Sequence, residues 1–300
     1  MTQKQHPWMI ERLQTIDRRW IFLFMAVAVI LPMSFSLTFD EAATPEVKAT
    51  YQLINELPRG SRVLVSFDFD PPSEPELKPM ADSFVRHLCQ QKQKIYFMAL
   101  WPMGQAETLD TVNRVINQEF PSYTYGQDYV MLGFKPGGQG VIQVVVSEIR
   151  ALYTTDALGT PIDDIPMMQN VKKLNDIDLI LNISAGFPGL KEWIQFGADR
   201  SGVAIAGGLT AVSAPLLYPY YPKQLKGIIG GLKAAAEYES LLIDGYPEVY
   251  TRDSKMFAAI RRMGPQTLAH LVIILFIVVG NICYFTTSRS GGSRLKSLEK

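Results

Sequence analysis

The sequence predicts an α/β fold: a single three-layer Rossmann-like domain with a mostly parallel sheet, flanked by one N-terminal and one C-terminal transmembrane helix. Apolar runs rich in β-branched and aromatic residues alternate with segments of helical spacing along the middle of the 300-residue chain. That alternation is typical of a parallel sheet covered by helices on both faces. Two further runs, 20–39 and 263–288, contain no Asp, Glu, Lys or Arg, and each is long enough to cross a hydrocarbon core of about 30 Å.

Charge divides the chain into three compartments. The whole chain has 29 basic and 29 acidic residues, but the tail 1–19 has a net charge of +2 and the tail 289–300 of +3, which leaves −5 on the central segment 40–262. A nucleic-acid binder needs a basic patch that displaces counterions from phosphates, so this balance excludes one. The cysteines fall in different compartments, Cys89 in the central segment and Cys283 in the second apolar run, which excludes a disulfide framework.

The first apolar run follows basic residues and begins with Trp20, the pattern of a signal anchor. A cleaved signal peptide is the alternative, because Ser34 and Ser36 imitate a small-x-small cleavage site. Four basic residues precede this run and only Lys48 and Arg59 follow it closely, so the N-terminus is expected in the cytoplasm. The second run has basic flanks on both sides and gives no orientation. With two crossings of the cell membrane, both tails are expected in the cytoplasm and the central domain outside it.

The periodicity of apolar residues and the residue composition predict the helices and strands of the central segment. Apolar runs rich in β-branched and aromatic residues predict strands at 62–69, 94–100, 129–134, 176–184 and 202–208. Apolar residues at helical intervals predict helices at 42–57, 75–91, 105–120, 140–152, 190–199 and 222–243. The segment 140–152 also resembles a strand, but Val141, Val144, Val145 and Ile149 fit a helical stripe better. Residues 153–176 are predicted to be a connection.

Open α/β sheets bind ligands at the carboxyl ends of their strands. Small and polar residues that follow the predicted strands therefore form a candidate ligand or metal cleft: Asp68, Asp70, Lys135, Gly137, Gly138, Gly140, Ser184, Gly186, Gly207 and Gly208. The alternative is that these turns and small residues only connect strands to helices, as any fold of this kind requires. No cofactor and no assembled metal site is predicted.

The segment Phe67-Asp68-Phe69-Asp70 after an apolar strand resembles the first motif of haloacid-dehalogenase-like phosphatases. The resemblance implies a nucleophilic role for Asp68 and an acid/base role for Asp70. This sequence departs from the family because Pro71-Pro72 follow the motif and Asp163-Asp164 precede Ser184 in the reverse of the family's order. Two nearby carboxylates can hold a hard cation. The alternative is a strand end that exposes its acids to water.

The loop from Lys135 to Gly140 can cradle an anion with its backbone N–H groups or be a plain tight turn. It matches neither a P-loop nor a clean dinucleotide-binding fingerprint. In the central segment the one histidine, His87, lies two residues from Cys89 on a predicted helix, so the two side chains point in different directions. No His-based triad, no zinc spacing and no catalytic residue is predicted.

The clearest pattern is structural. In the predicted helix 222–243, Gly227, Gly231 and Ala235 recur every fourth residue, although each glycine costs a helix about 1 kcal/mol. Close approach of another backbone is the expected compensation, either the domain's own sheet or another subunit. Just before this helix, Tyr218, Tyr220 and Tyr221 stand between prolines, a composition suited to a contact surface or to a loop that covers the core.

The order of span, α/β domain and span broadly resembles the auxiliary subunits of some bacterial ABC transporters, whose extracytoplasmic α/β domains lack an evident active site. The leading hypothesis is a non-catalytic, membrane-anchored subunit of a larger assembly. Its expected partners are the lipid bilayer and other membrane subunits or copies of itself, with no nucleic acid. The alternative is a membrane-tethered ligand-binding or metal-dependent hydrolytic domain that uses Asp68, Asp70 and the loop 135–140.

Overall fold

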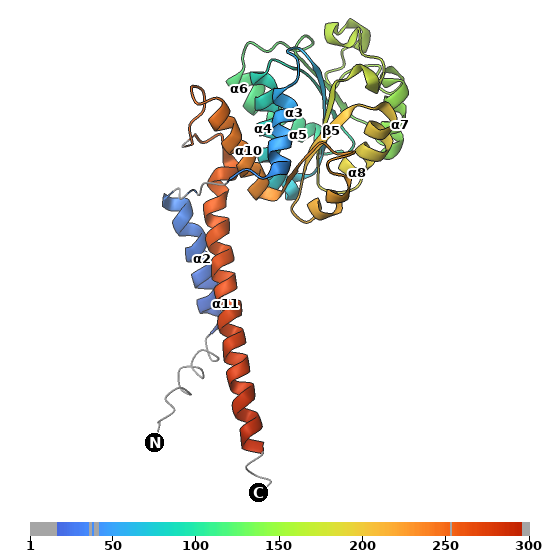
Figure 1. Ribbon diagram of the computed structural model, residues 1–300. Helices are drawn as coiled ribbons and strands as arrows, with labels where there is room; N and C mark the ends of the chain where they lie inside the picture. Colours follow the sequence, from blue (N-terminus) through green and yellow to red (C-terminus); the bar gives the residue numbers. More distant parts are fainter. Residues whose placement is uncertain (1–16, 36–37, 39–41, 253, 296–300) are drawn as a thin grey trace. The chain divides into compact units, whose positions relative to one another are not determined.

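The computed structural model describes residues 17–35, 38, 42–252 and 254–295, with side chains described up to residue 285 (Figure 1). Most of the tail 1–19, the last residues of the tail 289–300, and residues 36, 37 and 39 of the first apolar run lie outside the described residues. The chain divides into two units, one of residues 1–39 with 261–300 and one of residues 40–260. The larger unit holds the sheet, and the smaller one holds the apolar helices.

The larger unit is built on a parallel sheet with the strand order β3-β2-β1-β4-β5-β6. In the described part of the chain the strands are β1 (Arg62–Asp68), β2 (Lys94–Ala99), β3 (Tyr129–Phe134), β4 (Leu179–Ser184), β5 (Ala204–Leu209) and β6 (Gly227–Gly230). The chain starts in the middle of the sheet, builds one half outward and returns beside β1 for the other half, which is the doubly wound order. The α/β prediction is confirmed, and the described sheet is wholly parallel.

Helices cover both faces of the sheet, as the near-continuous burial of the strands requires. They are α3 (Pro45–Asn55), α4 (Glu74–Gln90), α5 (Gly104–Thr111), α6 (Asn117–Glu119), α7 (Gln139–Ser147), α8 (Leu190–Glu192), α9 (Asp199–Ser201) and α10 (Gly231–Gly245). A π-helical turn joins α5 to α6 and another joins α8 to α9. Figure 1 shows α3, α4, α5 and α10 on one side of the sheet and α7 and α8 on the other, which gives three layers.

Two adjacent glycines in β5 allow this close packing from both sides. A Cβ on Gly207 would lie 2.8 Å from the methyl carbons of Leu190 in α8, and a Cβ on Gly208 would lie 2.8 Å from the sulfur of Met80 in α4. Successive residues of a strand point to opposite faces, so each glycine admits the helix on its own face. Both were candidate ligand residues, and their place in the fold is to pack helices against the sheet.

The predicted helix 222–243 is wrong in its first part, because Gly227 lies in β6 and α10 begins at Gly231. The i, i+4 spacing of glycines therefore spans a strand and a helix and forms no helical stripe. A Cβ on Gly227 would lie 2.7 Å from Cα of Thr50 in α3, and a Cβ on Gly231, whose φ is +74°, would lie 2.7 Å from Cβ of Ala211. Ala235 is fully buried. The close approaches thus occur inside the domain.

The two terminal helices are α2 (Arg18–Phe35) and α11 (Ala258–Leu295). By length and composition, α2 and the part Ala258–Phe285 of α11 are each long and apolar enough to cross a membrane. The rings of Phe24 and Phe276 meet edge to face with centroids 6.2 Å apart, so the two helices contact each other.

The first turn of α11 belongs to the larger unit. The backbone N–H groups of Ala259 and Ile260 donate to the Glu239 carboxylate of α10 at 3.1 and 2.8 Å. Glu239 is fully buried, and burial raises its pKa to about 8. A carboxylate at a helix N-terminus satisfies N–H groups that have no partner within the helix.

We expect Gly227→Ala to destabilise the domain by about 1–3 kcal/mol, because the new methyl group is forced against the backbone of α3. Gly140→Ala is the matched control, since a Cβ there meets no atom within 4 Å and Gly140 lies in α7. Alanine suits a helix better than glycine, so this control is expected to be neutral or slightly stabilising. Urea denaturation of the full chain in mild detergent measures both. Equal stabilities would contradict the packing of β6 against α3.

Candidate functional site

In a doubly wound sheet, ligands bind outside the carboxyl ends of the strands where the strand order reverses. Here the reversal lies between β1 and β4. The register pairs Ser66 with Asn182 and Asp68 with Ser184, and residues two apart on a strand share a face. Four polar side chains therefore lie together at the carboxyl end of the two central strands, and two of them, Asp68 and Ser184, are sequence-predicted site residues.

Asp68 is buried completely and bonded from several elements. Its Oδ1 accepts the backbone N–H of Leu100 at 2.7 Å. Its Oδ2 accepts the hydroxyl of Ser66 at 2.8 Å, the amide N–H of Asn182 at 2.6 Å and the indole N–H of Trp193 at 3.1 Å. Burial raises the pKa of Asp68 to about 6, although these hydrogen bonds oppose the shift. The carboxyl group is thus a structural centre beneath the surface.

The two aspartates of the phosphatase-like motif occupy different environments. The expectation that this strand end exposes its acids to water is wrong for Asp68, because its side chain is fully buried. Burial also argues against a nucleophilic role, since a nucleophile must be accessible to the substrate. Asp70 is half-buried and accepts the hydroxyl of Ser73 at 3.0 Å, at the start of a 3₁₀ turn. The hydrogen bonds of Asp68 and Asp70 within the protein therefore favour a structural role for this motif.

The segment from Lys135 to Gly140 forms a tight turn between β3 and α7. Gly137 and Gly138 have φ values of +130° and +55°, the left-handed region that favours glycine. The ammonium of Lys135 lies 5.2 Å from the ring centre of the buried Tyr153, within cation–π range. Gly140 is already inside α7. Gly137 and Gly138 thus give the turn its shape, and Lys135 packs on Tyr153.

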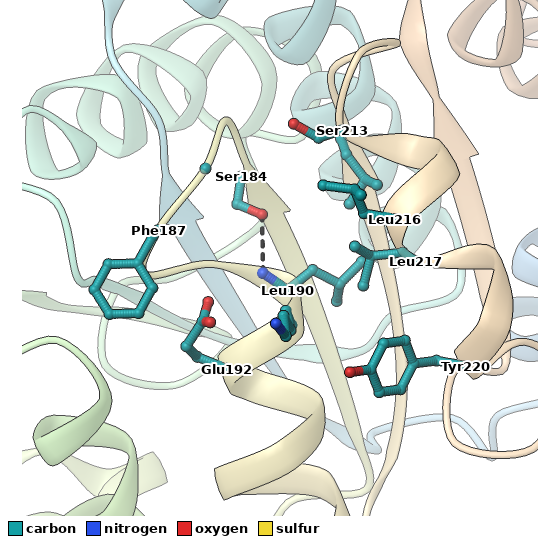
Figure 2. A pocket seen from close by; sticks show the side chains of 11 residues that line it. Ser184, Phe187, Leu190, Glu192, Ser213, Leu216, Leu217 and Tyr220 are labelled. Carbon is teal, nitrogen blue, oxygen red and sulfur yellow. Dashed lines mark hydrogen bonds between the residues drawn. The ribbon is translucent and has the colours of Figure 1, made fainter.

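A pocket of about 390 Å³ opens at the same edge of the sheet, between the connection from β4 to α8 and the connection from β5 to β6 (Figure 2). It is lined by Ser184, Gly186, Phe187, Leu190, Lys191, Glu192, Leu209, Ser213, Leu216, Leu217 and Tyr220. The pocket brings together Ser184 and Gly186 from the predicted cleft and Tyr220 from the predicted contact loop. The other lining residues were not predicted, and the one pattern in the sequence that marks any of them is the adjacent pair Leu216-Leu217 in a connection.

Backbone donors at the pocket wall already have internal partners. The N–H of Leu190 donates to Ser184 Oγ at 3.0 Å, the bond drawn in Figure 2. The N–H of Gly189 donates to the carboxylate of Glu192 at 2.9 Å. The start of this helix is therefore capped by the chain's own side chains, and the protein's own carboxylate takes the place that an anion would need.

Large apolar side chains are exposed on the connections that follow β2, β4 and β5. We call this set the apolar edge: Met103, Phe187, Val212, Leu216 and Tyr218. Val212 is 84% exposed and Leu216 71%. Because these parallel strands end at one edge of the sheet, the side chains of the apolar edge lie on the connections at that edge, where open α/β sheets bind ligands.

His87 and Cys89 lie near the C-terminal end of α4, away from this edge. His87 is buried in α4 with Nδ1 2.7 Å from the hydroxyl of Tyr238 and its ring stacked on Tyr51, and burial lowers its pKa to about 3. Cys89 is buried, and burial raises the pKa of its thiol. Among the described residues, no group of three or more His, Cys, Asp or Glu side chains is arranged to hold a metal ion.

Comparison with known proteins gives no family for this chain. No protein-family model matches the sequence, and no curated protein matches it. The functional conclusion therefore depends on the apolar edge, the pocket beside it and the two terminal helices.

Both oxygens of the Asp68 carboxyl group accept hydrogen bonds, whereas an amide has only one accepting oxygen. We therefore expect Asp68→Asn to destabilise the fold by about 1–3 kcal/mol. Folding raises the pKa of Asp68 to about 6, so the contribution of Asp68 to stability is full below about pH 4 and is lost as the pH rises through about 6. The cost of the substitution should therefore shrink between pH 4 and 7. Urea denaturation at several pH values measures this. Asp70→Asn is the control, since an amide oxygen can still accept the hydroxyl of Ser73, and it should change the stability little. The prediction would be contradicted if the free-energy cost of Asp68→Asn did not change with pH.

Proposed function

We propose that this protein is a membrane-anchored, non-catalytic subunit of a larger membrane assembly that presents its α/β domain outside the cytoplasm. The observation that carries the proposal is the apolar edge, a set of large side chains exposed on a domain whose chain continues at both ends into helices long and apolar enough to cross a membrane. Exposed apolar patches mark sites of interaction on soluble surfaces.

The chemistry at the strand ends supports a binding role over hydrolysis. A carboxylate that acts as a nucleophile or general base must reach the bound substrate. Here the carboxylate at the switch point, Asp68, is enclosed and bonded to Asn182 and Trp193 of the protein itself. The hydrolytic alternative would need this group to face a substrate.

The composition of the apolar edge supports a protein partner. Aromatic residues and Met are enriched in the cores of protein interfaces, and the edge contributes Phe187, Tyr218 and Met103 together with the aliphatic Val212 and Leu216. The tyrosine loop predicted as a contact surface is part of it, since Tyr218 is 49% exposed. Gly227, Gly231 and Ala235 are buried in the domain and are no longer candidates for contact with a partner.

The distribution of basic residues supports the proposed topology. The segment before α2 is richer in Lys and Arg than the segment that follows it, which favours a cytoplasmic N-terminus. A second crossing by α11 then returns the chain to the cytoplasm.

Topology can be tested with single cysteines. We expect Leu158→Cys, at a position 62% exposed on the domain, to react with a membrane-impermeant maleimide in intact cells. Lys4→Cys, in the N-terminal tail, should react only after the membrane is permeabilised. The wild-type chain gives the background, since Cys89 and Cys283 are buried. The opposite pattern would place the domain in the cytoplasm, and loss of residue 4 from the mature chain would indicate cleavage of the first apolar run.

Assembly can be tested with a matched pair of valines. We expect the wild-type chain, extracted gently from its native membrane, to co-purify with a partner in a fixed ratio. Val212→Lys at the apolar edge should abolish this recovery, whereas Val249→Lys, 58% exposed after the end of α10, should retain it. A lysine at the centre of an apolar contact is poorly tolerated. Purification of the wild type as an unassociated monomer, or equal recovery with both variants, would contradict the proposal.

A further inference from the structure

We propose that the pocket between the β4–α8 and β5–β6 connections binds a small neutral molecule with an apolar body and a carbonyl oxygen. The pocket shares Phe187 and Leu216 with the apolar edge, and the test below measures it on the chain without a protein partner. Its volume of about 390 Å³ lies within the range of roughly 300–1,000 Å³ typical of small-molecule sites. It also lies at the carboxyl edge, where α/β sheets bind ligands.

The walls of the pocket select an apolar body. Figure 2 shows Leu190 on one side and Leu216 and Leu217 on the other, with Phe187 at the margin. Leu209 completes the lining at the end of β5. Burying an apolar group against such walls is favourable by about 25 cal/mol per Å² of surface removed from water.

The charges of the pocket disfavour an anionic ligand. The buried Glu192 contributes a carboxylate to the lining and holds the N–H of Gly189. Ser184 Oγ holds the N–H of Leu190, so the backbone donors that bind anions at a helix start are used internally. Lys191 also lines the pocket but is exposed to water, where its charge is screened. A carboxylate or phosphate group would meet a like charge here.

Two hydroxyl groups supply the polar recognition. Tyr220 accepts a hydrogen bond from the side-chain amide of Gln195 at 2.8 Å, and Ser213 accepts one from the hydroxyl of Thr210 at 3.0 Å. Because each hydroxyl accepts in these bonds, each keeps its own hydrogen to donate. Both line the pocket. A ligand that offers a hydrogen-bond acceptor, such as a carbonyl oxygen, matches this pair of donors, and a ligand that offers only donors does not.

Binding can be measured by saturation-transfer NMR titration of the full chain in lipid nanodiscs with three aromatic probes of one size. The neutral ketone 4-phenylbutan-2-one should bind. Butylbenzene, which lacks the oxygen, should bind up to about tenfold more weakly, since one hydrogen bond contributes about 1 kcal/mol. The anion 4-phenylbutanoate should bind more weakly than the ketone. Empty nanodiscs report partition into the lipid.

Variants connect the binding to the pocket. Tyr220→Phe combined with Ser213→Ala should remove the preference for the ketone over butylbenzene and leave the fold intact, since both side chains reach the surface. Leu216→Lys should weaken the binding of all three probes, whereas Leu158→Lys, at a similarly exposed leucine outside the pocket, should leave their binding unchanged. The proposal is overturned if the anion binds more tightly than the ketone, if no probe binds at millimolar concentration, or if Leu216→Lys and Leu158→Lys act alike.

Discussion

The fold depends on the buried carboxylate of Asp68. It gathers donors from its own strand, from the end of β2, from β4 and from the helix that packs on the sheet. A buried acid is tolerated only when it is bonded, so these elements must be in place together. Asn182 and Trp193 bond to Asp68 at the point where the strand order reverses, which is where doubly wound domains bind ligands. The pocket lies beside this point, at the connections after β4 and β5.

Most of the sheet could be predicted from the sequence, because strands buried on both faces appear as continuous apolar runs. The exception, β6, has four residues, two of them glycine. Its glycines admit close neighbours, Thr50 of α3 at Gly227 and Ala214 at Gly230. By coincidence, the spacing from Gly227 to Gly231 continues into α10 with a helical period. Local periodicity cannot separate a short strand and the following helix from one longer helix when the deciding contacts come from Thr50, far away in the chain.

The site was predictable only in part, for a related reason. The positions of Ser184 and Gly186 after a predicted strand identified these two residues, and the composition of the tyrosine loop identified Tyr220. No pattern in the sequence indicated that the three line one pocket. Whether Asp68 faces water or the interior depends on Asn182 and Trp193, which lie more than a hundred residues further along the chain. The resemblance at Asp68 and Asp70 rests on residue types, which do not show whether a side chain is accessible. The burial that argues against a phosphatase-like role can therefore be seen only in the structure.

The contact between Glu239 and the start of α11 determines where the chain can be shortened. A soluble fragment that ended before Ala258 would delete both backbone donors to Glu239 and leave an interior acid without them. Removal of one partner of a buried polar pair commonly costs about 1–3 kcal/mol. A water-soluble version for crystallisation should therefore end inside α11, beyond Ile260 and before the apolar run that begins at Met263.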